Sequence, residues 1–208
     1  MKKRGCILIF LGIALIAISL GLHLAQENSD QIAGENSRIL LRQLQLSNAP
    51  VAIPGTIPQV SPEESPSEPA APYSMPEKGY LGYSMIGTLR VPSVKVELPV
   101  LSTWSYDLLK VAPCRYSGSV AGEDMILMGH NYKSHFKPLH KVEVGDTVEF
   151  EDVNGVVYRY VVAQITTLHK NEGELLPADY PLTLFTCTPG GQKRIIIRCC
   201  ADEQEDLP

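Results

Sequence analysis

Residues 182–198, which read LTLFTCTPGGQKRIIIR, constrain the fold more than any other stretch of this chain. Side chains alternate along Thr183–Cys187, and a branched aliphatic run fills Arg194–Cys200, as is typical of half-buried strands. Pro189-Gly190-Gly191 lies between the two runs and predicts a turn. The stretch therefore predicts an antiparallel β-hairpin, with a cysteine ending its first strand and an arginine starting its second.

The register of this hairpin decides which arginine lies near the cysteine. If the turn runs from Thr188 to Lys193, Cys187 lies opposite Arg194. Arg198 is on the same face of its strand, but it lies opposite Thr183 and about 13 Å further along. We therefore expect Arg194, and not Arg198, to reach a negative charge that forms at Cys187. For Arg198 we expect a charge on the barrel surface or in a substrate groove.

A histidine follows a second apolar run. Met125–Met128 leads directly into Gly129-His130-Asn131, and a buried strand there would hold the His130 ring in place. Cysteine, histidine and arginine are the nucleophile, the proton-transfer group and the oxyanion donor of acyl transfer to a thiol. A structural histidine is the alternative. The motifs offer no carboxylate to orient His130, so Asn131 is either a helper or a surface residue.

Three histidines recur every five residues and raise the question of a metal site. Five residues correspond to about 500° of helix, so His130, His135 and His140 would not share one helical face. We therefore expect no metal and no cofactor. We place His135 and His140 on the surface or in a helix.

These motifs together resemble the sortase family. Thr183-Leu184-Phe185-Thr186-Cys187 resembles the T-L-x-T-C signature of sortases, and Gly129-His130-Asn131 resembles their histidine motif. The resemblance covers roughly residues 79–202, with the motifs in the expected order. Further matching positions are Arg194, Phe136, Leu139 and Gly145-Asp146.

The expected strands agree with an all-β domain. Seven or eight short strands in about 120 residues predict a closed barrel or a sandwich, and the sortase resemblance favours an eight-stranded closed β-barrel with short helices in its crossings. Asp152-Val153-Asn154-Gly155 predicts a hairpin turn. Expected helices cover 104–110 and 134–141. The expected strands cover 85–91, 95–100, 125–128, 147–151, 156–168, 182–187 and 194–200.

The N-terminal segment predicts a membrane anchor. Lys2-Lys3-Arg4 precedes Cys6–Leu24, an apolar run long enough to cross a bilayer of roughly 30 Å. A cleaved signal peptide is the alternative, but Leu22 does not suit a cleavage site, and the apolar run is longer than the apolar region of a typical signal peptide. Positive charge before the helix predicts a cytoplasmic N-terminus and an extracellular catalytic domain in a single-pass cell-membrane protein.

The rest of the chain divides by composition. Prolines recur from Pro50 to Pro76, which predicts an extended segment that is either a stalk holding the domain off the membrane or a linker of unselected length. We expect a cytoplasmic basic tip and transmembrane anchor at 1–25, a proline-rich extracellular linker at 26–78, the sortase barrel at 79–202 and an acidic tail at 203–208. A net charge of -5 excludes nucleic acid as an expected partner.

The five cysteines call for different expectations. For Cys114 and Cys199 a disulfide or a buried apolar role is expected, whereas the motif makes Cys187 the nucleophile. The adjacent Cys199 and Cys200 point to opposite faces of a strand, so they are not expected to pair with each other. Cys6 lies in the apolar N-terminal run.

The resemblance also implies an activity. Cys187 would form an acyl-thioester with a secreted protein bearing an LPxTG-like C-terminal sorting signal, His130 would donate and accept protons, and Arg194 would stabilise the oxyanion. An amine of a peptidoglycan precursor or of a pilin would then take up the acyl group. Thr186, Asn131 and Arg198 are candidate substrate-binding residues.

The sequence also favours one class of sortase over another. The chain contains no aspartate-proline-aromatic lid motif, and its residues after 202 form an acidic tail. Both features favour a class B/D-like, wall-anchoring sortase over a pilin-polymerising one. A membrane-tethered cysteine hydrolase and a non-catalytic surface β-domain are the alternatives.

Overall fold

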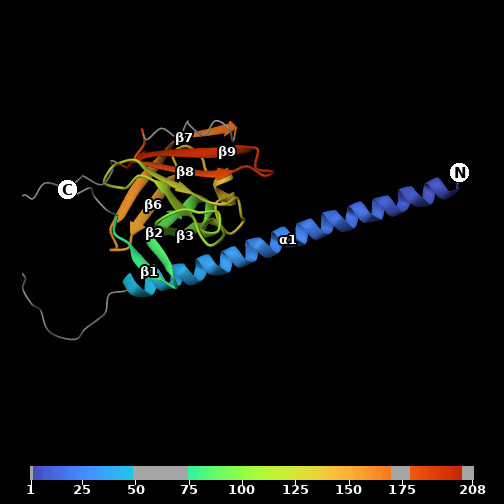
Figure 1. Cartoon of the computed structure of the whole chain (residues 1–208). Helices are drawn as coiled ribbons and strands as arrows, with labels where there is room; N and C mark the ends of the chain where they lie inside the picture. Colours follow the sequence, from blue (N-terminus) through green and yellow to red (C-terminus); the bar gives the residue numbers. More distant parts are fainter. Residues whose placement is uncertain (1, 49–74, 170–178, 203–208) are drawn as a thin grey trace, which may run out of the picture.

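The computed structural model describes residues 2–48, 75–169 and 179–202, which form a β-barrel and one long helix beside it (Figure 1). The helix is α1 (Lys2–Asn48), and three short 3-10 helices lie in the connections. These are η1 (Pro92–Val94), η2 (Leu108–Lys110) and η3 (Lys137–Lys141). The strands are β1 (Lys78–Tyr80), β2 (Tyr83–Val91), β3 (Val96–Leu101), β4 (Cys114–Ser117), β5 (Met125–Met128), β6 (Thr147–Asp152), β7 (Val157–His169), β8 (Leu182–Cys187) and β9 (Lys193–Ala201).

Eight of these strands close the barrel in the order β2-β3-β4-β5-β8-β9-β7-β6, because β6 pairs back onto β2. β1 adds a short outer strand to the first residues of β2. The β3–β4 and β5–β8 pairs are parallel and the others are antiparallel. The eight-stranded closed barrel confirms the fold expected from the sequence. All seven expected strands form, and β4, which was not expected, is the eighth.

Strand alternation divides the side chains of β8 between two environments. Leu182 and Leu184 point into the barrel core, together with Met125 and Leu127 of β5. Phe185 lies on the other face, in a smaller cluster with two isoleucines of β5 and β9. Burying each of these large apolar side chains contributes roughly 1.5–3 kcal/mol. The core thereby fixes which face of β8 its last residue presents.

The β8–β9 hairpin has the register expected from the sequence. Cys187 pairs with Arg194, and Thr183 pairs with Arg198. The turn is closed by the Thr188 N–H, which donates to the Lys193 carbonyl at 2.8 Å. Gly190 and Gly191 in this turn both have positive φ, a conformation that glycine adopts without strain.

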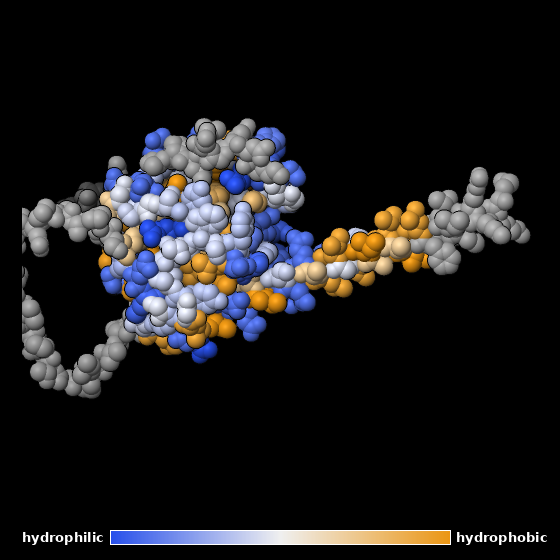
Figure 2. All heavy atoms as spheres, in the orientation of Figure 1, coloured by the Kyte–Doolittle hydropathy of each residue, from blue (hydrophilic) through white to orange (hydrophobic). Residues whose placement is uncertain are grey.

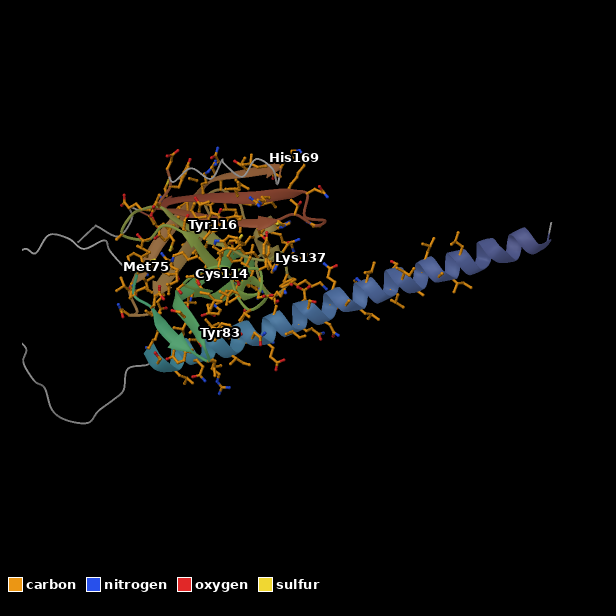
Figure 3. The ribbon with its side chains drawn as sticks, in the orientation of Figure 1. Met75, Tyr83, Cys114, Tyr116, Lys137 and His169 are labelled. Carbon is orange, nitrogen blue, oxygen red and sulfur yellow. The ribbon has the colours of Figure 1, made fainter. Side chains whose placement is uncertain are left out.

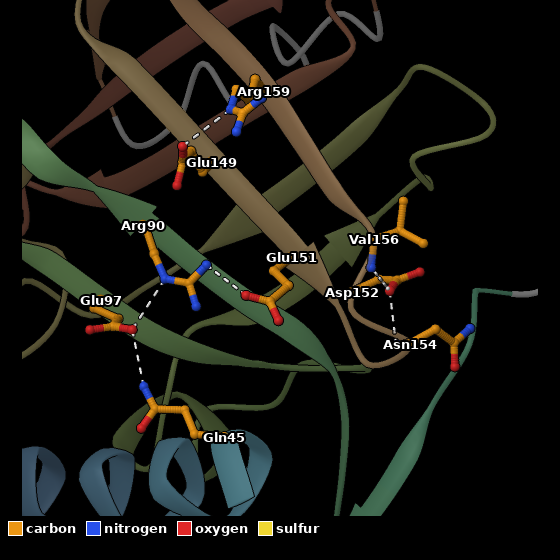
Figure 4. Close-up of polar contacts among 9 residues, drawn as sticks. All are labelled: Gln45, Arg90, Glu97, Glu149, Glu151, Asp152, Asn154, Val156 and Arg159. Atoms are coloured by element: carbon orange, nitrogen blue, oxygen red, sulfur yellow. Dashed lines mark hydrogen bonds and ion pairs between the residues drawn. The ribbon is translucent and has the colours of Figure 1, made fainter. Parts of the chain in front are cut away.

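The β6–β7 turn also follows its expected Asn-Gly sequence. The buried Asp152 side chain accepts hydrogen bonds through Oδ1 from the N–H groups of Asn154 at 2.8 Å and Val156 at 2.9 Å (Figure 4). On the barrel exterior nearby, Arg90 bridges Glu97 and Glu151. The helical crossings are shorter than expected, since η2 and η3 occupy only the last residues of 104–110 and 134–141.

Helix α1 has two different halves. Its first half extends away from the barrel, and its apolar side chains from Leu11 to Leu24 are exposed (Figures 1 and 2). One stretch of α1, within Leu11–Ser47, is long and apolar enough to cross a membrane. The second half packs on the barrel through Ala33, Ser37, Leu40 and Leu44, all of them buried.

The packing of α1 bears on the linker expected at 26–78. Residues 26–48, placed in that linker by the sequence, continue α1, and residues 49–74, where the extended proline-rich segment is expected, lie outside the described part of the chain. Both ends of that segment are at the barrel, because Lys78 Nζ donates a hydrogen bond to Ser47 Oγ and Met75 is buried in the core (Figure 3). The distance from the apolar helix to the barrel is therefore set by α1, which contacts the barrel before the prolines begin, and not by a proline stalk.

Candidate active site

The structure gathers His130, Cys187 and Arg194 around one cavity of about 190 Å³ at the turn end of the β8–β9 hairpin. Cys187 ends β8 and Arg194 lies near the start of β9, whereas His130 comes from a distant part of the sequence, just after the end of β5. The remaining lining residues are Trp104, Tyr106, Leu109, Tyr116, Met128, Gly129, Phe185 and Thr186.

Cys187 is the last residue of β8 and is exposed. It shares the face of Phe185, two residues earlier, because side chains alternate along the strand. Unlike Cys187, Cys114 and Cys199 are buried, and burial raises the pKa of each of these two thiols to about 12. A thiolate is the reactive form of cysteine, so these two thiols are inert at neutral pH.

The four cysteines of the barrel domain are all free. Cys114, Cys187, Cys199 and Cys200 form no disulfide with one another. Of the two roles expected for Cys114 and Cys199, a disulfide or a buried apolar residue, the structure shows the second. Cys200 is exposed while Cys199 is buried, which confirms that the adjacent pair points to opposite faces of β9.

The two arginines of β9 have different surroundings. Arg194 lines the cavity beside Cys187, and its guanidinium carbon lies 5.8 Å from the centre of the Phe185 ring. Arg198 does not line this cavity. Its Nη1 donates to Gln164 Oε1 at 2.6 Å, and its guanidinium lies over the Tyr180 ring.

His130 is half-buried directly after β5. Its ring stacks on Tyr132 with 4.7 Å between the ring centres. Burial lowers the pKa of His130, and the positive charge of Lys110 lowers it further. The neutral imidazole is therefore favoured near pH 7, and a neutral imidazole can accept a proton from a thiol.

Of the two neighbours predicted as substrate-binding residues, Thr186 lines the cavity and Asn131 does not. Thr186 is buried, and its Oγ1 donates to the Gly129 carbonyl at 2.8 Å, which ties β8 to the residue before His130. Asn131 does not line the cavity. Its Oδ1 is buried without a hydrogen-bond partner among the described residues.

An aromatic wall beside Cys187 was not expected from the sequence. Trp104 is 5.9 Å from Tyr106 and 5.5 Å from Tyr116, and Tyr116 is 5.5 Å from Phe185, measured between ring centres. Trp104, Tyr106 and Tyr116 are exposed. The one sequence signal was the only tryptophan of the chain, two residues before a tyrosine, in a segment with no strand pattern.

The expectation for His135 was wrong. His135 is completely buried between the barrel and α1. Its ring contacts the side chain of Ser37 in α1, a residue 98 positions away in the sequence. Burial lowers the pKa of His135 to about 4. Within residues 2–48, 75–169 and 179–202, no group of three or more histidine, cysteine or acidic side chains could hold a metal ion.

The sortase domain model matches residues 89–202, so the chain belongs to the sortase family of cysteine transpeptidases. No curated protein sequence matches it. Solved structures share the fold over the barrel. Sortase C1 of Streptococcus suis is 25% identical, with a TM-score of 0.51 over 59% of this chain and 76% of that one.

Two other structures are similar to the same extent. Sortase C1 of Streptococcus agalactiae is 27% identical, with a TM-score of 0.51 over 57% of this chain and 68% of that one. Clostridium perfringens sortase C, solved with the C-terminal cell wall sorting motif, is 25% identical, with a TM-score of 0.52 over 57% of this chain and 71% of that one.

Proposed function

We propose that this protein is a membrane-anchored sortase. Its Cys187 attacks a peptide bond in the sorting signal of a secreted surface protein, and the acyl part of that surface protein is then transferred to an amine. The observation that carries the proposal is the single cavity lined by His130, Cys187 and Arg194. The arrangement supplies a nucleophile, a proton carrier and an oxyanion donor at the same place.

The reaction can be written from these three groups. Neutral His130 takes the proton from the Cys187 thiol, and the thiolate adds to the scissile carbonyl. The Arg194 guanidinium donates hydrogen bonds to the oxygen that becomes negative. The tetrahedral intermediate collapses as the peptide C–N bond breaks, and the imidazolium of His130 protonates the leaving amine. A second amine then attacks the thioester carbonyl and gives a proton to neutral His130, the C–S bond breaks to release the Cys187 thiolate, and a new amide bond forms.

The resemblance to sortases suggests an LPxTG-like signal as the acyl donor and an amine of a peptidoglycan precursor or pilin as the acceptor. The aromatic wall beside Cys187 offers apolar surface to a peptide that contains leucine and proline. A class B/D-like, wall-anchoring role is favoured because the sequence contains no Asp-Pro dipeptide and hence no aspartate-proline-aromatic lid. All described residues that line the cavity also belong to the barrel domain.

The apolar stretch of α1 supports a site for this reaction at the membrane surface. Lys2-Lys3-Arg4 before the apolar run favours a cytoplasmic N-terminus and an extracellular barrel. Lys133, three residues after His130, binds Glu27 and Asp30 of α1. Glu27 and Asp30 follow the end of the apolar run at Leu24 by about 5–9 Å of helix rise. A substrate still held in the membrane by its own C-terminal segment would therefore meet the site without a long reach.

The test is a peptide assay on the full chain in detergent micelles or liposomes. An LPxTG-type peptide with a fluorophore and a quencher on either side of the scissile bond is incubated alone, with hydroxylamine, and with a panel of triglycine, lysine and diaminopimelate. A sortase gives amine-dependent products that retain the acyl half of the peptide. Cleavage to the free acid at a rate that no amine changes would indicate a cysteine hydrolase. No reaction under any condition would indicate a non-catalytic domain.

A further inference from the structure

The second half of α1 carries a buried stripe that the catalytic chemistry does not use. Ala33, Ser37, Leu40 and Leu44 recur at intervals of four, three and four residues, which places them on one face of the helix. Leu40 and Leu44 pack with Leu101 and Leu109 in a cluster separate from the barrel core. The N-terminal end of the stripe lies instead against the loop that carries His130.

The histidine loop, which we define as residues 130–136, makes three polar contacts with α1 through Lys133 and Ser134. The Lys133 N–H donates to Asp30 Oδ1 at 2.9 Å, and Ser134 Oγ donates to the Asp30 carbonyl at 2.9 Å. The Lys133 ammonium also pairs with Glu27. Figure 3 shows Lys137, which follows this loop, on the side of the barrel next to α1.

Gly34 allows the closest approach of the helix to this loop. A Cβ at position 34 would lie 2.9 Å from Ser134 Cβ and 3.4 Å from Ser134 Oγ. Real Cβ atoms do not approach other carbons this closely, so any side chain at Gly34 must push the loop away from the helix. By contrast, a Cβ at Gly21 of the same helix meets no atom within 4 Å.

A buried hydrogen-bond chain lies at the centre of this interface. Ser37 Oγ donates its hydrogen to the Val111 carbonyl at 2.6 Å. Its lone pairs are then left to accept from His135 Nε2, which is 3.0 Å away. A hydroxyl has one hydrogen, so this arrangement assigns the proton of His135 to Nε2. The side chain of His135 is therefore held in one orientation by α1.

His135 is connected to His130 through Tyr132. The Tyr132 ring is 5.4 Å from the ring of His135 and 4.7 Å from the ring of His130, between centres. The backbone supports the same turn, since the His135 N–H donates to the Tyr132 carbonyl and the Phe136 N–H donates to the His130 carbonyl. A movement of His135 would therefore displace the ring on which His130 stacks.

We propose that the second half of α1 is a positioning element for the catalytic histidine, with Ser37 and His135 as positioning residues. The inference rests on the proposed role of His130. Apart from His130, the residues lining the cavity lie outside the histidine loop, so peptide binding persists when the loop shifts. The helix that anchors the enzyme thus also completes its active site. Loss of docking lowers turnover and leaves KM nearly unchanged.

The first test compares two substitutions of His135 in the full chain. In His135→Gln the side-chain amide can still donate to Ser37, whereas His135→Leu fills similar space without a donor. We expect His135→Leu to lower kcat by at least about tenfold with KM within about twofold, because small misplacements of catalytic groups cost factors up to about 10². His135→Gln should recover most of the loss. Equal kcat values in both variants and the wild type would overturn the proposal.

The second test does not depend on His135 and does not weaken the helix. Gly34→Ala raises helix propensity and yet crowds Ser134, so we expect it to lower kcat when Ser134 is present. In a Ser134→Gly background the same substitution should have no effect, because the colliding Cβ is gone. Gly21→Ala is the matched control and should match the wild type. A loss in Gly34→Ala that persists fully in the Ser134→Gly background would contradict the proposal.

A readout without substrate separates this proposal from the proposed function. The rate of Cys187 alkylation by iodoacetamide is measured against pH in a Cys200→Ser background, since Cys200 is also exposed. We expect the wild-type profile to depend on His130, and His135→Leu and Gly34→Ala to change it in the same direction as His130→Ala does. If the wild type transfers no peptide, the proposed function fails, and this profile still decides the role of α1. Identical profiles in all variants would overturn the positioning role.

Discussion

Cys187 and Arg194 are directly opposite each other in the β8–β9 ladder, one residue before and one residue after the Thr188–Lys193 turn. Arg198, on the same strand, is opposite Thr183 and bound to Gln164. Only one of the two guanidiniums is therefore in the same cavity as the thiol, although both are on one strand face.

This difference predicts that Arg194→Lys loses far more activity than Arg198→Lys. Both substitutions keep the charge, but an ammonium cannot reproduce the fixed, planar donors of a guanidinium. Losing one oxyanion donor costs roughly 10²–10³ in rate, and the loss should appear in kcat because the oxyanion exists only near the transition state. Steady-state kinetics of both variants with the same peptide decides the assignment. A larger loss in Arg198→Lys would contradict it.

The charge of Lys110 predicts a shift in the pH dependence of the reaction. Lys110 lowers the pKa of His130, so its removal in Lys110→Ala should raise that pKa. The mechanism starts from neutral His130, and the acid limb of the kcat/KM profile should therefore move to higher pH. Because Lys110 is exposed, the shift should shrink in 1 M salt. A shift to lower pH, or an unchanged profile at low salt, would contradict the assignment of this limb to His130.

The buried His135 predicts a loss of stability in acid. Its pKa of about 4 in the folded protein is below the ordinary value of 6.5, so the unfolded chain takes up the proton first as the pH falls. Stability from this group is complete above pH 6.5 and is lost between pH 6.5 and 4, by about 3 kcal/mol. The His135→Gln variant should lose less of its free energy of unfolding over the same pH range. Urea unfolding followed by the fluorescence of Trp104, the only tryptophan, measures the difference.

The docking of α1 changes what truncation should do. A chain that starts at residue 26 keeps the buried stripe, and we expect it to remain folded and active without the apolar run. A chain that starts at residue 79 loses Met75, Leu40 and Leu44, and each leucine contributes roughly 1.5–3 kcal/mol by its burial. We expect this shorter chain to have a much lower melting temperature. Equal melting temperatures for the two would mean that α1 contributes nothing to the barrel.

The hairpin and its register could be predicted from the sequence because they depend on local rules. Strand alternation and a Pro-Gly-Gly turn were enough to pair Cys187 with Arg194. Strand β4, with the sequence CRYS, was missed because it lacks the apolar run by which β5, also four residues long, was predicted.

The docked helix and the buried histidine could not be read from local patterns. The N-terminal half of the stripe consists of Ala33 and Ser37, which carry no strong apolar signal. His135 looked like a surface residue because its partner Ser37 is 98 positions away. The aromatic wall likewise forms only when the barrel brings Tyr116 and Phe185 beside Trp104.

The most direct test of the account is the mass of the enzyme during the reaction. The full chain is incubated with an LPxTG-type peptide, quenched in acid, and digested for mass spectrometry, with Cys187→Ala as the control. We predict an added mass equal to the acyl half of the peptide on the fragment that contains Cys187. Hydroxylamine should remove this mass, and Cys187→Ala should show neither the adduct nor peptide cleavage. Peptide cleavage by Cys187→Ala, or an adduct on Cys114, Cys199 or Cys200 in its place, would contradict the central claim.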